Sequence, residues 1–64
     1  MQRNAALTEA IERAGGLQAL GRMLGISKQA IDQWRRVPAE RVLEVERLTG
    51  ISRYQLRPDV FGKR

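Results

Sequence analysis

The fold is decided by residues 17–36, LQALGRMLGISKQAIDQWRR. In the first half of this stretch, Leu17, Leu20 and Leu24 recur at intervals of three and four residues. Side chains with this spacing lie on one face of a helix. The pattern therefore predicts an amphipathic helix over residues 17–24, with its leucines packed in the core.

The second half of the stretch predicts another short amphipathic helix, over residues 28–36. Ile31 and Trp34 repeat the three-residue step, and the polar side chains fall largely on other faces. We expect Trp34 to pack in the core, because it shares the apolar face with Ile31. A stacking platform for single-stranded nucleic acid is the weaker interpretation of this tryptophan.

The residues between these two predicted helices are typical of a tight turn. Gly25 is free to adopt a positive φ, Ile26 is an apolar plug, and Ser27 is a suitable N-cap for the next helix. Gly21 falls where the helices should approach closely, so that a side chain larger than alanine would push them apart. This spacing resembles the helix-turn-helix of Cro-type repressors, whose second helix enters the major groove of DNA.

Turn signals also mark a helix before the helix-turn-helix. We expect it over residues 5–14, with Asn4 or, alternatively, Thr8 as its N-cap. The pair Gly15-Gly16 should end it.

Two further helical pieces are expected after the helix-turn-helix. The first should run over residues 38–49 and stop at Gly50, because proline suits the first turn of a helix. Ser52 then caps a short turn over residues 53–56, which Pro58 closes.

Five helical pieces with no strand signal predict a compact, all-α, five-helix domain that contains the helix-turn-helix. No repeat, low-complexity tract or linker is present, so residues 1–64 are expected to form a single domain. The tail, residues 59–64, is the least determined segment. Its Val60 and Phe61 either pack back on the domain, fray, or contact a second copy or another partner.

The composition excludes several classes of protein. At 64 residues the chain is near the lower size limit for a domain that folds without disulfides or a structural metal ion. It has no cysteine and no histidine, which excludes disulfides and the usual zinc sites, and we expect neither metal nor cofactor. It also lacks a glycine-rich phosphate loop and paired carboxylates in an evident cleft. We therefore expect no enzymatic activity.

No apolar run approaches the roughly 20 residues that span a bilayer. Residues 1–14 also lack the apolar core of an export signal. We expect a soluble protein of the cytoplasm that is associated with the nucleoid and not with a membrane.

The charge is unevenly distributed along the chain. The formal net charge is +5, and residues 15–36 and 51–64 each carry a net +3, while the other segments are neutral or slightly acidic. Such a pattern favours a polyanion as partner. The alternative is that the arginines only keep a small domain soluble.

Phosphate contacts supply most of the affinity of a DNA-binding protein and fix its register. The open N-terminus of the 17–24 helix, after Gly16, suits a phosphate. Four positions are expected to contact phosphates: Leu17 through its backbone N–H, Gln18, Arg22 and Arg35. For Gln18, bracing the second helix and simple exposure to solvent remain alternatives.

Base readout is expected from the exposed positions of the second helix. Glutamine can pair with adenine, lysine can donate to guanine, and aspartate can accept from cytosine. The predicted base-reading residues are Ser27, Lys28, Gln29, Asp32, Gln33 and Arg36. An intrahelical ion pair between Lys28 and Asp32 is as well supported as base readout for Asp32.

The chain up to about Phe61 resembles the small, prophage-encoded YdaS-like group of Cro-type regulators. The resemblance is carried by AIERAGGLQALGRMLGISKQAIDQW, residues 10–34, and more diagnostically by RVPAERVLEVERLTGISRYQLRPDVF, residues 36–61. It implies a helical DNA-binding domain that represses or tunes transcription from prophage-type promoters. Some members of this group are assigned as antitoxins, and many are longer at the C-terminus.

Together these patterns predict a sequence-specific, double-stranded DNA-binding transcription regulator, a Cro-like repressor that reads its operator through the 28–36 helix. A homodimer, formed either in solution or only on DNA, should bind half-sites about 34 Å apart. Two rivals remain: an antitoxin-type module that binds a toxin through Val60 and Phe61, and an architectural or excision-type DNA binder.

Overall fold

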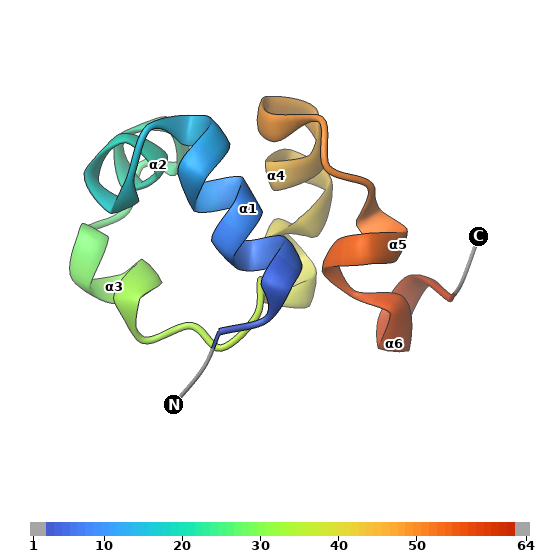
Figure 1. Cartoon of the computed structure of the whole chain (residues 1–64). Helices are drawn as coiled ribbons and strands as arrows, with labels where there is room; N and C mark the ends of the chain where they lie inside the picture. The colour runs from blue at the N-terminus through green and yellow to red at the C-terminus, as the bar shows by residue number, and fades with distance from the viewer. Residues whose placement is uncertain (1–2, 63–64) are drawn as a thin grey trace.

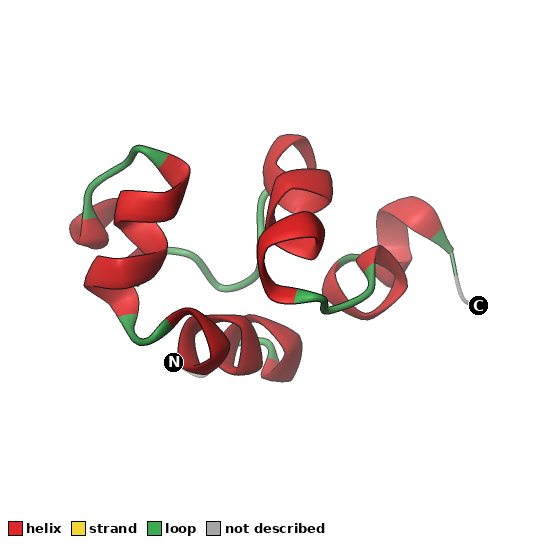
Figure 2. Cartoon of the chain, turned by 90° about the horizontal axis from the view of Figure 1, so that it is seen from above, coloured by secondary structure: helices red, strands yellow, loops and turns green. Residues whose placement is uncertain are grey.

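The structure, a computed structural model, describes residues 3–62, and within them every regular element is a helix (Figures 1 and 2). The helices are α1 (Ala5–Ala14), α2 (Leu17–Leu24), α3 (Lys28–Asp32), a 3-10 turn (Ala39–Arg41), α4 (Val42–Thr49), α5 (Arg53–Leu56) and α6 (Pro58–Phe61). The predicted all-α fold is confirmed, with six α-helices instead of five.

The sixth helix forms in the segment that the sequence left undetermined. Pro58 begins α6 and does not close α5, because its missing N–H and restricted φ suit a first helical position. Phe61 packs against the core, whereas Val60 is 49% exposed. The expected tail therefore folds back at least to Phe61, and Lys63 and Arg64 lie outside the described residues.

The third helix is shorter than the sequence suggested. α3 ends at Asp32, and the expected continuation to Arg36 is a loop. The loop allows Val37 to reach the core, where it is fully buried. The helix ends in a tighter, 3-10-type turn, because the N–H of Trp34 donates to the carbonyl of Ile31, three residues back, at 2.9 Å.

The expected helix over residues 38–49 begins differently from a regular α-helix. Its first turn, Ala39–Arg41, is a 3-10 helix, and α4 follows from Val42. Its end at Gly50 is as expected, with a left-handed φ of 78°.

Side-chain caps set the beginnings of three helices. Asn4 Oδ1 accepts from the Ala6 N–H at 2.8 Å, Ser27 Oγ from Ala30 at 3.2 Å, and Ser52 Oγ from Tyr54 at 3.0 Å. Asn4, and not Thr8, is therefore the N-cap of α1.

One hydrophobic core joins the elements. Its buried residues are Leu7, Ala10, Leu20, Leu24, Ile31, Val37, Val42, Val45, Ile51 and Leu56. Trp34 is partly buried against this cluster, as expected from its spacing to Ile31. In Figure 1, α1 crosses the molecule between α2 and α3 on one side and α4 and α5 on the other, and α1 contacts α2, α4 and α5.

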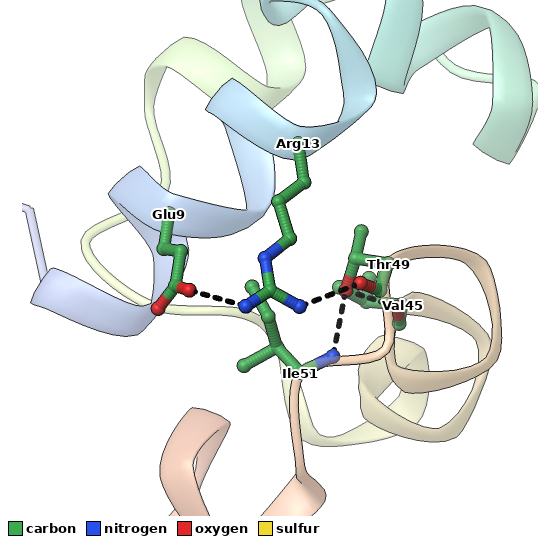
Figure 3. A network of polar contacts seen from close by, with 5 residues as sticks. All are labelled: Glu9, Arg13, Val45, Thr49 and Ile51. Atoms are coloured by element: carbon green, nitrogen blue, oxygen red, sulfur yellow. Dashed lines mark hydrogen bonds and ion pairs between the residues drawn. The ribbon is translucent and has the colours of Figure 1, made fainter.

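Arg13 ties α1 to the end of α4 (Figure 3). Its guanidinium pairs with Glu9 at 2.6 Å and donates to the carbonyl of Thr49 at 3.1 Å. Thr49 Oγ1 in turn donates to the Val45 carbonyl at 2.8 Å and accepts from the Ile51 N–H at 3.3 Å. This network holds the two helices that frame the helix-turn-helix. Among the described residues, no helix is long and apolar enough to cross a membrane.

Candidate nucleic-acid interface

The turn between α2 and α3 is packed backbone against backbone. A Cβ added to Gly21 would lie 2.6 Å from the carbonyl oxygen of Ile26, so that even alanine is too large there. The Ile26 N–H donates to the Gly21 carbonyl at 2.9 Å, and Gly25 ends α2 with a φ of 75°. The sequence correctly predicted a close contact at Gly21. The prediction excluded only side chains larger than alanine, whereas the structure has no room for alanine either.

Arg41 fixes the other side of the same turn. Its Nη1 donates to the Leu24 carbonyl at 3.3 Å, near the C-terminus of α2, where a cation is favourable. The same guanidinium pairs with Glu44 at 3.4 Å. Sequence reasoning missed this residue, because its partner lies 17 positions away and no local pattern connects them.

The packed turn brings the first residues of α2 beside the first residues of α3. Between them lies an open pocket of about 350 Å³, lined by Gln18, Arg22, Ile26, Ser27, Lys28 and Gln29. Five of these six are predicted DNA-contacting residues, drawn from both the phosphate set and the base set. Their side chains are exposed, so a ligand outside the molecule can reach them together.

The N-terminus of α2 has no side-chain cap, because Gly16 precedes it. Leu17 is partly buried against the core, so that only its backbone N–H is suited to a phosphate. Gln18, in the same turn, is exposed beside the pocket. This geometry is compatible with an anion at the start of α2.

The other predicted DNA-contacting residues lie at the end of α3 or in the loop after it, away from the pocket. Gln33 is exposed and caps the end of α3, and Arg35 and Arg36 are exposed in the loop that follows. Asp32 is 64% exposed and pairs with Arg3 and not with Lys28. The intrahelical pair with Lys28, the alternative to base readout for Asp32, is therefore not formed, because Arg3 from outside the helix pairs with the carboxylate.

Arg36, one of the predicted base-reading residues, contacts α6. Its Nη1 is 3.4 Å from Asp59 Oδ2, and Arg57 holds both oxygens of the same carboxylate at 2.9 and 2.8 Å. The hydrogen bonds from Arg57, aided by the charges of Arg57 and Arg36, lower the pKa of Asp59 to about 2. The bonded carboxylate correspondingly raises the pKa of Arg57, whose Nη1 also donates to the Val37 carbonyl at 3.0 Å.

The exposed surface around α2 and α3 is cationic. Between Arg13 and Ala39 the chain has four basic residues and a single acidic one, Asp32. The four are Arg22, Lys28, Arg35 and Arg36, and all are exposed. Because Asp32 is paired, this face presents net positive charge to a ligand.

Two helices joined by a glycine-tight turn, with the second helix exposed along its polar side, define a helix-turn-helix protein of the Cro fold. The structure superposes with a TM-score of 0.84 on the Cro protein from the prophage element Xfaso 1 of Xylella fastidiosa strain Ann-1. The two are 44% identical, and the match covers 89% of this chain and 95% of the other. The chain belongs to the family described as "Bacterial toxin YdaS", whose model matches residues 7–64.

A curated relative supports the same placement. The "Putative transcriptional regulator YdaS" of Escherichia coli strain K12 is 36% identical over 63 residues. The match covers 89% of this chain but 64% of the relative, so the chain spans about two thirds of that protein's length. The resemblance stated from the sequence is thus confirmed. The family description and the relative's name differ, since one says toxin and the other transcriptional regulator.

Proposed function

We propose that this chain is a sequence-specific, double-stranded DNA-binding transcription regulator, a Cro-like repressor without enzymatic activity, that places α3 in the major groove. The observation that carries the proposal is the pocket between α2 and α3, where exposed polar and basic side chains stand on a rigid turn. The names of the Xylella Cro protein and of the Escherichia coli regulator support it.

Within this proposal, the two helices divide the work. The start of α2, with Gln18 and Arg22, contacts phosphates and sets the register. Lys28 and Gln29, in the first turn of α3, read base edges. Because α3 ends at Asp32, Gln33 and Arg36 would contact DNA from the end of the helix and from the loop, not from a helical face.

We further propose that two copies bind together. The molecule measures 30 × 26 × 19 Å along its principal axes, so two copies side by side fit half-sites about 34 Å apart. Within residues 3–62, the exposed large apolar side chains are Met23, Leu43 and Val60. An association that forms only on the operator is consistent with so little apolar surface.

The proposal is tested by selecting bound sites from a random-sequence duplex library at about 150 mM salt, where nonspecific binding is weak. An enriched inverted repeat is the expected result and would also reveal the operator. Enrichment of nothing, with only weak and salt-sensitive binding, would contradict sequence-specific regulation.

A variant of Gln29 sharpens this test. Gln29→Ala should lower operator affinity by about 1–3 kcal/mol and relax the preference at one base pair, since a bidentate contact to adenine is lost. The matched control is Gln55→Ala, because Gln55 is an exposed glutamine on α5, outside the pocket. Unchanged affinity and unchanged preference in Gln29→Ala would mean that the reading surface lies elsewhere.

A protein-interaction module is the second candidate, favoured by the family description as a toxin. Phe61 packs against the core, which leaves Val60 as the exposed apolar residue of α6. Co-purification of a neighbouring gene product that is lost in Val60→Asp, with DNA selection unsuccessful, would favour this candidate. A strong bend of bound DNA with no effect on transcription would instead indicate an architectural binder.

A further inference from the structure

The C-terminal end of α3 carries an unfavourable negative charge that no residue of the helix neutralises. Asp32 places a carboxylate at the C-terminal, partially negative end of the helix, and the last turn of α3 contains no basic residue. The same carboxylate is the single acidic group within residues 14–38, the segment that the proposed function directs toward DNA. An unpaired Asp32 would therefore weaken both the helix and its binding to DNA.

Arg3 supplies the missing cation from 29 residues away in the chain. Its Nη2 pairs with Asp32 Oδ1 and also donates to the Asp32 backbone carbonyl at 3.3 Å. The Arg3 side chain is 30% exposed, and its Nε is buried without a hydrogen-bond partner among the described residues. A guanidinium that has lost much of its water is held more firmly by its anion than one in open solvent.

A second contact joins the same two segments. The backbone N–H of Asn4 donates to the carbonyl of Arg35 at 2.7 Å, while the Asn4 side chain caps α1. Figure 1 shows this N-terminal segment beside the loop that follows α3. Residues 3 and 4 therefore bracket the end of α3, from Asp32 to Arg35, and connect it to the first helix of the domain.

We propose that Arg3 is a positioning residue for DNA readout, which neutralises Asp32 and fixes the end of α3 so that Lys28 and Gln29 are presented to the duplex. This inference rests on the proposed function, in which α3 reads DNA. Without Arg3, Asp32 is free to pair with Lys28 one turn away. That pair would withdraw the lysine from DNA and leave a carboxylate facing the phosphates.

A double-mutant cycle tests the proposal, because it separates a positioning role from a direct contact. The proteins are the unsubstituted chain, Arg3→Gln, Asp32→Asn and the double variant. Each is measured by fluorescence anisotropy against the selected operator and against a random duplex, with thermal unfolding to confirm folding. The control is Arg13→Gln, since Arg13 also forms an ion pair but its partners, Glu9 and Thr49, lie outside α3.

We expect Arg3→Gln to weaken operator binding about tenfold, but by less than about twofold when Asp32 is already asparagine. Arg13→Gln should remain within about twofold of the unsubstituted protein, and Asp32→Asn serves as the background in which the loss on removing Arg3 is compared. Arg3→Lys, which keeps the charge, should recover most of the binding. If Arg3→Gln does not fold, Arg3→Met takes its place in the cycle, because methionine keeps the aliphatic length and removes the charge. In NMR spectra, Arg3→Gln should shift the Lys28 and Gln29 amides, and Asp32→Asn should partly reverse this shift.

Two results would overturn the inference. An equal loss in both Asp32 backgrounds would mean that Arg3 contacts DNA itself, and no loss in either would mean that it has no role in binding. Failure of the proposed function is distinguished from both, because the unsubstituted protein would then bind neither duplex specifically.

Discussion

At the scale of single residues, Gly21 is the glycine with the least room for a side chain, because the Ile26 carbonyl approaches it closely. We expect Gly21→Ala to lower the free energy of unfolding by about 1–3 kcal/mol, because the added methyl group forces α2 and the turn apart. Urea denaturation monitored by circular dichroism measures this loss.

Gly25→Ala is the control for this prediction. Gly25 has a φ of 75° but open space around it, so its replacement costs only backbone strain, about 1 kcal/mol. DNA affinity should fall more in Gly21→Ala than in Gly25→Ala, since only the first displaces the two helices. Equal stability of Gly21→Ala and the unsubstituted protein would contradict the close contact.

Asp59 gives a pH-dependent prediction at the same scale. Its pKa is lowered from 3.8 to about 2, so the folded state favours the ionised carboxylate. The resulting stabilisation is present above about pH 4 and is lost as the pH falls through about 2, below which the carboxyl is protonated in both states. Asp59→Asn should therefore melt at a lower temperature than the unsubstituted protein at pH 6.

Thermal unfolding between about pH 2 and 6 checks this prediction, because the two melting temperatures should converge at the acidic end. A constant difference across the whole range would show that Asp59 acts through packing and not through its charge. Glu12→Gln is a suitable control, since Glu12 is exposed on α1.

At the scale of elements, α3 depends on its surroundings. Five residues are too few for an independent helix, so its cap and its packing must hold it. Ser27→Ala removes the hydrogen bond to the Ala30 N–H and should cost about 1 kcal/mol of stability. It should also weaken DNA binding, because the start of α3 borders the pocket.

Ser52→Ala is the matched control, because Ser52 caps α5 in the same way through the Tyr54 N–H. It should lose about as much stability with no change in DNA affinity, which anisotropy and thermal unfolding together measure. Equal effects of both serines on DNA binding would argue against a special role of α3.

Elements whose limits depend on local chemistry could be predicted from the sequence. Asn4 and Ser27 as caps, and Gly25 and Gly50 as ends, all follow from short-range preferences, and the structure agrees. The end of α3 could not be predicted, because it depends on how the following loop brings Val37 into the core.

In the candidate site, too, features set by local sequence could be predicted and features set by tertiary contacts could not. The pocket residues could be predicted because the helix-turn-helix spacing is local. Arg3 could not, since its contact with Asp32 joins positions 29 residues apart and leaves no periodic signal. Pro58 was misread for another reason, because proline both ends and begins helices and only the packing of Phe61 decides.

At the scale of the whole molecule, charge governs the strength of binding. With a net charge of +5 gathered largely on the helix-turn-helix and the C-terminal segment, affinity should fall steeply as salt rises. Arg35→Gln should weaken binding to all sequences alike and reduce the slope of log affinity against log salt by about one. Anisotropy titrations at several salt concentrations measure this slope. A loss confined to one operator sequence would instead assign Arg35 to base readout.

The architecture of α3 also bears on how such a protein changes its target over generations. Ile31 is the one residue of this helix that enters the core, and the other four are exposed. Most substitutions at these exposed positions should therefore leave folding intact, since the turn at Gly21 and the contact from Arg41 to Leu24 lie outside α3. Under the proposed function, related proteins can therefore diverge in DNA specificity through a few codons while each intermediate still folds.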